Sequence, residues 1–204
     1  GDLPLIVVSP CTFLNTNAIV GNDHHMKNYR QYYPADVISL GDKGRQAWDE
    51  EGTLAIVDDL KKRFDAEDRV HVTGFSGGGL MTYRMVFKHP DLLAGAAPAC
   101  ANFFAQDLAA EVEGKFTEAD RTFPLHIITG EKDEHREWTF GKVGGTPGID
   151  PQTAWALEAV KKVGYPLAKR TRVPDLGHSP AYEQVIATIR PYVLGTKKRA
   201  EKLD

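Results

Sequence analysis

The feature that most constrains the fold is a recurring order of short apolar runs and longer amphipathic segments. Each run has the length of a strand, and the segments between them have helical spacing. Uninterrupted apolar runs are typical of parallel strands covered on both faces, whereas the last run alternates like an edge strand. The predicted strands are Leu5–Val8, Val37–Leu40, Val70–Thr73, Leu93–Ala97, Leu125–Thr129 and Lys169–Val173. We therefore expect an α/β fold with a mostly parallel sheet of about six strands and helices on both faces.

The length of the chain predicts how this sheet is organised into domains. The 204 residues are 42% hydrophobic and 26% charged, which is ordinary for a globular protein with one core. We expect residues 1–194 to form a single domain. Within it, residues 101–122 read as a short cap-like excursion between strands, and residues 195–204 as a solvated basic tail.

Charge and hydropathy exclude several classes of partner. The net charge of −3 gives no basic field for a nucleic acid. Every apolar run is shorter than the ~20 residues that span a bilayer, and the start of the sequence lacks the charged region and cleavage site of a signal peptide. We expect no nucleic-acid partner and no membrane span.

A serine stands where the third predicted strand gives way to a helical pattern. The sequence "GFSGG" places Ser76 between Gly74 and Gly78, which is the G-x-S-x-G pattern of a strained strand-to-helix turn. Such a turn exposes the hydroxyl and directs the following amide, that of Gly77, toward a developing oxyanion. Glycine-rich turns also occur without any catalytic role. A phosphate-binding loop is disfavoured because the turn lacks the terminal Gly-Lys-Ser/Thr.

A serine nucleophile needs a base and an acid that orients the base. Asp133 follows the fifth predicted strand, and His178 follows the sixth. Both lie on the same rim of the sheet as Ser76, because parallel strands all end on that rim. The chain order Ser, Asp, His is the one expected of an α/β hydrolase. Three other carboxylates compete for the role of the acid and read more simply as solvated loop residues: Glu131, Glu134 and Asp175.

Two polar patterns raise the question of a resident metal. Residues 22–25 read "NDHH", and Glu131, Asp133 and His135 alternate along one turn. Adjacent histidines seldom point at one ion, and the second set has no partner cluster nearby in sequence. We expect no metal and no cofactor.

Several motifs together resemble a known family. The segment "DAEDRVHVTGFSGGGLMTYRMVFKHPDLLAGAAPACANF" resembles the nucleophile region of the feruloyl esterase and polyhydroxybutyrate depolymerase-like branch of α/β hydrolases. The acid turn "GEKDEH" and the "GHSP" before the last helical pattern fit that branch as well. The resemblance extends from Leu3 to about Leu194. It implies an α/β-hydrolase fold, here without the N-terminal hairpin that usually precedes the first strand.

The resemblance also implies an activity and a set of roles. It makes the protein a serine esterase that works through an acyl-enzyme, with Ser76 as nucleophile, His178 as base and Asp133 as acid. The run "PLIVVSPCT" stands where that branch has a turn such as His-Gly-Cys, so the amide of Cys11 would be the second oxyanion donor beside Gly77. Because Ser-Pro replaces His-Gly here, the amide of Thr12 is the alternative.

The substrate implied is a carbohydrate-linked feruloyl or acetyl ester, and the location favoured is secreted or periplasmic. Four aromatic residues near the rim could form a slot for it: Phe13, Phe75, Phe103 and Trp138. Packing beneath the serine turn is an equal interpretation for Phe75 and Phe103. The alternatives are a depolymerase acting on a polymeric ester, a serine peptidase of the same fold and, more remotely, a non-catalytic binding protein.

The two cysteines, Cys11 and Cys100, both follow predicted strands on this rim. With the serine strand between theirs, two strand spacings separate them by about 10 Å. That exceeds the ~7 Å that a disulfide allows between Cα atoms. We expect free thiols unless the loops that carry the two cysteines converge.

Overall fold

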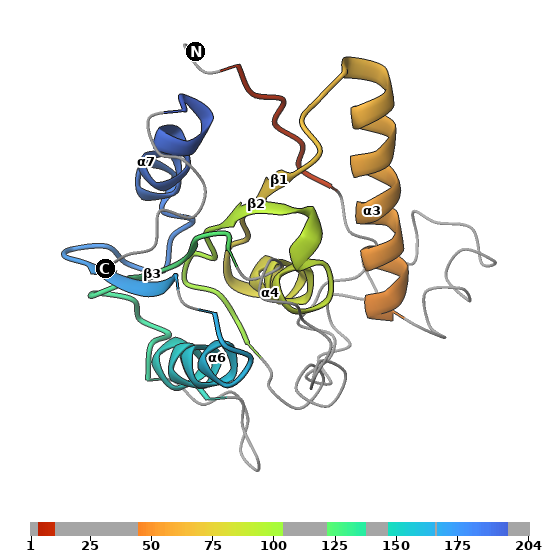
Figure 1. Ribbon diagram of the computed structural model, residues 1–204. Helices are drawn as coiled ribbons and strands as arrows, with labels where there is room; N and C mark the ends of the chain where they lie inside the picture. Colours follow the sequence, from red (N-terminus) through yellow and green to blue (C-terminus); the bar gives the residue numbers. More distant parts are fainter. Residues whose placement is uncertain (1–3, 11–44, 104–121, 138–146, 166, 196–204) are drawn as a thin grey trace, which may run out of the picture. The chain divides into compact units, whose positions relative to one another are not determined.

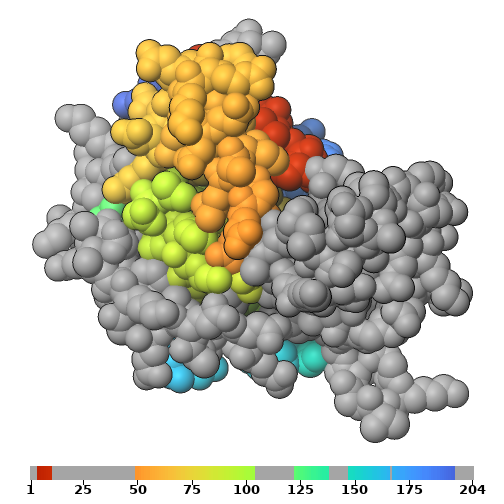
Figure 2. Space-filling model, turned by 90° about the vertical axis from the view of Figure 1, so that its right-hand side faces the viewer, coloured from red at the N-terminus to blue at the C-terminus, as the bar shows by residue number. Residues whose placement is uncertain are grey.

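The computed structural model describes residues 4–10, 45–103, 122–137, 147–165 and 167–195, which belong to two compact units (Figure 1). The smaller unit, Ile6–Asp68, contains helix α3 (Arg45–Phe64), seen from another side in Figure 2 (orange). Basic residues fill the last turn of α3, where they complement the negative end of the helix dipole. The larger unit, Gly1–Leu5 with Arg69–Asp204, holds the sheet.

The sheet of the larger unit has four described strands, all parallel, in the order β1-β2-β3-β4. They are β1 (Val70–Val72), β2 (Leu93–Ala96), β3 (Leu125–Gly130) and β4 (Ala168–Val173). These strands confirm four of the six predicted runs. β3 and β4 pair along their whole length, whereas β2 and β3 pair at Ala96 and Leu125 and again at the bridge between Ala99 and Ile128.

The expected count of about six strands is not met in the part of the chain that the structure describes. Leu5–Val8 is described and is not a strand, and its apolar side chains are exposed. An apolar run signals a tendency to be buried, but a strand forms only where a neighbour accepts its backbone hydrogen bonds. Val37–Leu40 lies outside the described residues, as do 104–121 of the expected excursion and 196–204 of the expected tail.

Helices cover both faces of the sheet, as predicted. On β3, the side chains of even-numbered residues face α7 (Tyr182–Val193), because His126 lies 2.7 Å from the Thr188 hydroxyl. Odd-numbered residues face the opposite side, where Arg170 bonds both the Thr129 hydroxyl and Asp150 of α6 (Ile149–Lys162). Helix α4 (Gly79–Lys88) packs on β2. No helix among the described residues is both long and apolar enough to cross a membrane.

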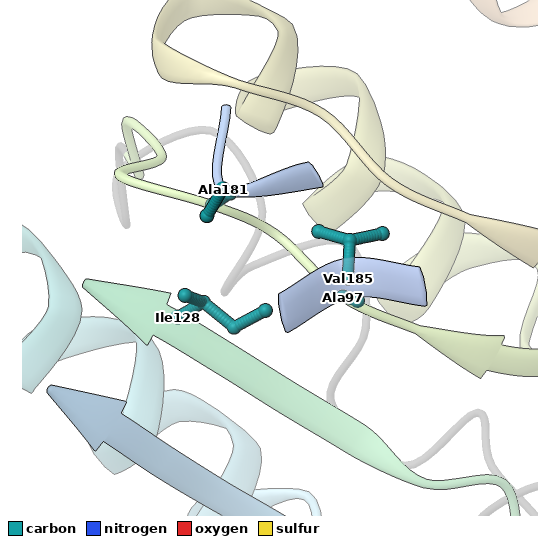
Figure 3. Packing of buried hydrophobic residues seen from close by; sticks show 5 residues of the cluster. Ala97, Ile128, Ala181 and Val185 are labelled. Atoms are coloured by element: carbon teal, nitrogen blue, oxygen red, sulfur yellow. The ribbon is translucent and has the colours of Figure 1, made fainter. Parts of the chain in front are cut away.

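The core has one small cluster on the α7 side and an aromatic group on the α4 side. Figure 3 shows Ala97, Ile128, Ala181 and Val185 packed where α7 begins against β3 and the segment that follows β2. The aromatic group is fully buried or nearly so and includes Tyr83, Phe87, Phe103, Phe123 and Tyr165. The small cluster includes Ala97 and Ala181, and the aromatic group includes Phe103, so both contain residues of segments that follow strands.

Candidate active site

The serine turn has the strained geometry that the motif predicts. Residues Ser76–Gly78 form a short 3-10 helix, η2, between β1 and α4, and Ser76 has a φ of 51°. A non-glycine residue in the left-handed region carries a conformational cost and persists only where its surroundings hold it. Here Ser76 N–H donates to Ala99 O at 3.3 Å, and Asn102 N–H donates to Ser76 O at 2.9 Å.

The two glycines of the motif contribute differently to this turn. A Cβ added to Gly74 would overlap the carbonyl group of Gly78, so the close approach of these two peptides requires glycine at position 74. A Cβ added to Gly78 would meet nothing within 4 Å. Gly77 is the second residue of η2, and the first amides of a helical turn have no partner within that turn.

Asp133 and His178 form a hydrogen-bonded pair at the carboxyl ends of β3 and β4. His178 Nδ1 lies 3.1 Å from Asp133 Oδ1 and 3.0 Å from Oδ2. The His135 amide also donates to Oδ1, at 2.8 Å. A carboxylate only accepts hydrogen bonds, so the proton of the neutral ring lies on Nδ1. Nε2 therefore retains the lone pair that a general base requires.

Burial and hydrogen bonding set the charges of this pair. The Asp133 side chain is fully buried and the His178 side chain is 13% exposed. Burial alone would lower the pKa of His178, but hydrogen bonds to Asp133 and Cys100, with their charges, raise it to about 9. Burial would raise the pKa of Asp133, yet hydrogen bonds from His178 and the His135 amide hold it below its ordinary value. The carboxylate thus stays ionised and favours a protonated ring.

Ring contacts bring this pair next to the serine turn. The His178 ring lies 4.7 Å from the ring of Phe75, the residue before Ser76, and 4.6 Å from the ring of His135. Four of the five described non-glycine residues with positive φ belong to the larger unit, namely Ser76, Cys100, Asp175 and Ala181; the fifth is Asp65. Such strain clusters at functional sites more often than elsewhere.

The rival carboxylates take other partners. Asp175 pairs with Lys132 at 2.6 Å on the surface. Glu134 is also exposed, and it accepts the backbone N–H of His178 at 3.2 Å. Sequence reasoning treated Glu134 as a solvated loop residue and missed this contact, although its position one residue after Asp133 was available as a signal.

Cys100 is the other group that sequence reasoning left out of the site. It is a buried free thiol whose Sγ contacts Gly177 O at 3.8 Å. Its sulfur, an Asp133 carboxylate oxygen and a His178 ring nitrogen all lie within 4.8 Å of one another. The sequence did contain a signal for this, because Cys100 follows a predicted strand that ends on the same rim of the sheet as the strands before Ser76, Asp133 and His178.

The remaining predicted site residues divide into two groups. Phe103 is buried, and its ring packs against Tyr83 at 4.9 Å and Phe87 at 5.9 Å, which removes it from any surface that a substrate would touch. The others lie outside the described residues: Cys11, Thr12, Phe13 and Trp138.

Comparison with solved structures defines the class of fold. The structure of SOBER1 from Arabidopsis thaliana matches with a TM-score of 0.55 at 19% identity, over 75% of this chain and 65% of that one. The structure of esterase PE8 matches with a TM-score of 0.50 at 18% identity, over 71% and 59%. This chain thus spans about two thirds or less of the solved chains. The chain therefore shares with these two solved structures an α/β fold, with a parallel sheet and helices on its faces.

The sequence comparisons add no family. No family model matches the chain, and no curated protein sequence matches it.

Proposed function

We propose that the protein is a serine carboxylic-ester hydrolase that works through an acyl-enzyme. The observation that carries the proposal is the strained Ser76, at a strand-to-helix turn, beside a histidine whose Nδ1 is bonded to a buried carboxylate. The esterase fold supports the same reading, because this arrangement of nucleophile, base and acid is typical of that fold.

The proposed mechanism assigns one role to each group. Ser76 attacks the ester carbonyl carbon while His178 Nε2 takes the serine proton, and Asp133 stabilises the imidazolium that forms. His178 then returns the proton to the leaving alcohol, and water repeats the sequence on the acyl-enzyme. The amide of Gly77, with that of Cys11 or Thr12, holds the oxyanion.

The proposed substrate is a carbohydrate-linked feruloyl or acetyl ester. The support is the sequence resemblance together with the partly buried Phe75 ring against His178, which offers an apolar contact beside the reacting groups. A panel of feruloyl and acetyl esters, an aliphatic polyester and a peptide amide separates this substrate from the depolymerase and peptidase alternatives.

The first test is labelling with a fluorophosphonate, which reacts with activated serines. We expect one adduct on the folded protein, mapped to the peptide that contains Ser76, and none on heat-denatured protein. Ser76→Ala should remove both the adduct and ester turnover, by several orders of magnitude relative to wild type (~10⁴-fold or more). Labelling at another residue, or turnover by Ser76→Ala near the wild-type rate, would contradict the proposal.

A further inference from the structure

We propose that Cys100, Asp133 and His178 form an inhibitory site for a thiophilic divalent cation of the zinc and cadmium type. Binding itself requires only these three side chains. The inhibitory consequence rests on the proposed function. The site differs from a resident metal centre, because Asp133 and His178 can take part in the proposed reaction only when no ion is bound to them.

The spacing of the three groups suits a tetrahedral ion. Bond lengths of about 2.0 to 2.3 Å separate neighbouring ligand atoms of a zinc site by about 3.3 to 3.7 Å. Here the carboxylate oxygens lie 3.0 and 3.1 Å from His178 Nδ1, and the Cys100 sulfur lies within 4.8 Å of both other groups. The carbonyl oxygen of Gly177, 3.8 Å from the sulfur, is available as a fourth ligand. Small shifts of side chains complete the site.

Charge and donor type select the ion. A thiolate and a carboxylate together carry two negative charges, which a divalent cation neutralises, so a bound ion leaves no net charge in this buried place. Thiolate and imidazole donors favour zinc and cadmium over magnesium or calcium, which prefer oxygen ligands. The partly exposed His178 side chain is the side from which an ion can approach, since Cys100 and Asp133 are buried.

An ion bound at this site would prevent His178 from acting as a base, because it would leave a proton on Nε2. The ion bonds to Nδ1 in place of the proton there. In a neutral ring that proton moves to Nε2; in an imidazolium, whose Nε2 already carries a proton, it passes to solvent. The thiol proton of Cys100 also passes to solvent. Nε2 then carries a proton and cannot accept another from Ser76. Because the ion sits on the far side of the ring from the serine, it should lower kcat and leave KM unchanged.

The experiment titrates the metal-free 204-residue chain with cadmium and follows the ultraviolet thiolate-to-cadmium absorption band, which requires no turnover. We expect a saturable band at one ion per chain, displaced by zinc. Cys100→Ser and Cys100→Ala should each abolish the band and weaken zinc binding by at least ~10-fold, the loss that even an indirect partner of a metal ligand can cause. Cys11→Ser is the matched control and should keep the band. Thermal melting shows that each variant is folded.

The enzymatic arm measures ester hydrolysis with added zinc and then with excess chelator. Wild type should lose kcat and recover it, while the two Cys100 variants should need at least ~10-fold more zinc for the same loss. A cadmium band that persists in both folded Cys100 variants would contradict the proposed site. So would a loss of ester hydrolysis that needs the same zinc concentration in wild type and in both Cys100 variants. A band without any ester hydrolysis supports the site and contradicts the proposed function instead.

Discussion

Replacing Asp133 by asparagine keeps the size of the side chain and removes the charge that His178 contacts. The surroundings raise the pKa of His178 from 6.5 to about 9. At about 1.4 kcal/mol per unit, the surroundings favour the imidazolium by about 3 kcal/mol, and Asp133 provides the largest favourable part. A loss of stabilisation equal to this whole shift would slow the step that forms the imidazolium by about 300-fold. An amide that also reverses the ring tautomer raises the loss to about 10⁴-fold.

The assay compares kcat/KM of wild type and Asp133→Asn on the best ester of the substrate panel, with chelator present. Values are compared on the alkaline plateau, where His178 is neutral in both proteins, because the substitution also lowers the pKa of the ring. We expect a decrease between about 300-fold and about 10⁴-fold, with a melting curve that shows a folded protein.

Glu134→Gln is the matched control, since it makes the same carboxylate-to-amide change one residue further along. Glu134 accepts the His178 backbone N–H at 3.2 Å from an exposed side chain, and a glutamine oxygen can accept it too. We expect a change within about threefold. A loss as large as that of Asp133→Asn, or an Asp133→Asn variant within tenfold of wild type, would refute the assignment of Asp133 as the orienting acid.

Two further predictions concern pH and the loop before His178. Asp133 and Cys100 raise the pKa of His178 to about 9 against the effect of burial, and the His135 ring lies beside it. The neutral base accumulates as the pH rises through that value, so kcat/KM should rise there to a plateau. A flat pH profile would contradict His178 as the base. A Cβ at position 130 would overlap the carbonyl oxygen of Leu176 and lie 2.7 Å from that of Gly177. Gly130→Ala should therefore lower the free energy of unfolding by roughly 1–3 kcal/mol, which a lower melting temperature would show, and it should also lower kcat/KM. Gly52→Ala in α3, where an added Cβ meets nothing within 4 Å, is its control, and equal melting temperatures for the two variants would contradict the steric argument.

The strands of the described sheet could be predicted because burial on both faces leaves a direct signature in the sequence. The runs that became β1 to β4 are flanked by helical patterns and turn residues, so they could be identified as strands. Leu5–Val8 has the same apolar composition and is not a strand. Composition records how readily a segment is buried, whereas a strand also needs a paired neighbour, and pairing depends on residues far away in the sequence.

The candidate site was predictable where it depends on topology. Asp133 and His178 were expected together because each follows a strand on one rim, and the structure brings them within hydrogen-bond distance. His126 of β3 also bonds the hydroxyl groups of Thr171 and Thr188, each at 2.7 Å.

The surroundings of Cys100 could not be predicted, because they depend on a local backbone conformation. Strand spacing assigned Cys100 a place in a regular sheet. In the structure the segment after β2 leaves that geometry, and Cys100 adopts a φ of 42°. Left-handed backbone at a residue other than glycine has almost no signature in a sequence, so the contact of the thiol with Gly177 O appears only in three dimensions.

The three proposed catalytic side chains follow three different strands, β1, β3 and β4, of a sheet whose described strands are all parallel. Contacts between residues so distant in sequence form slowly, because the intervening chain must be closed into loops before they are made. No partly folded form that contains only the serine turn and its helix would hold the base. Recovery of ester turnover during refolding therefore reports completion of the whole sheet, and it should lag behind the recovery of helical circular dichroism.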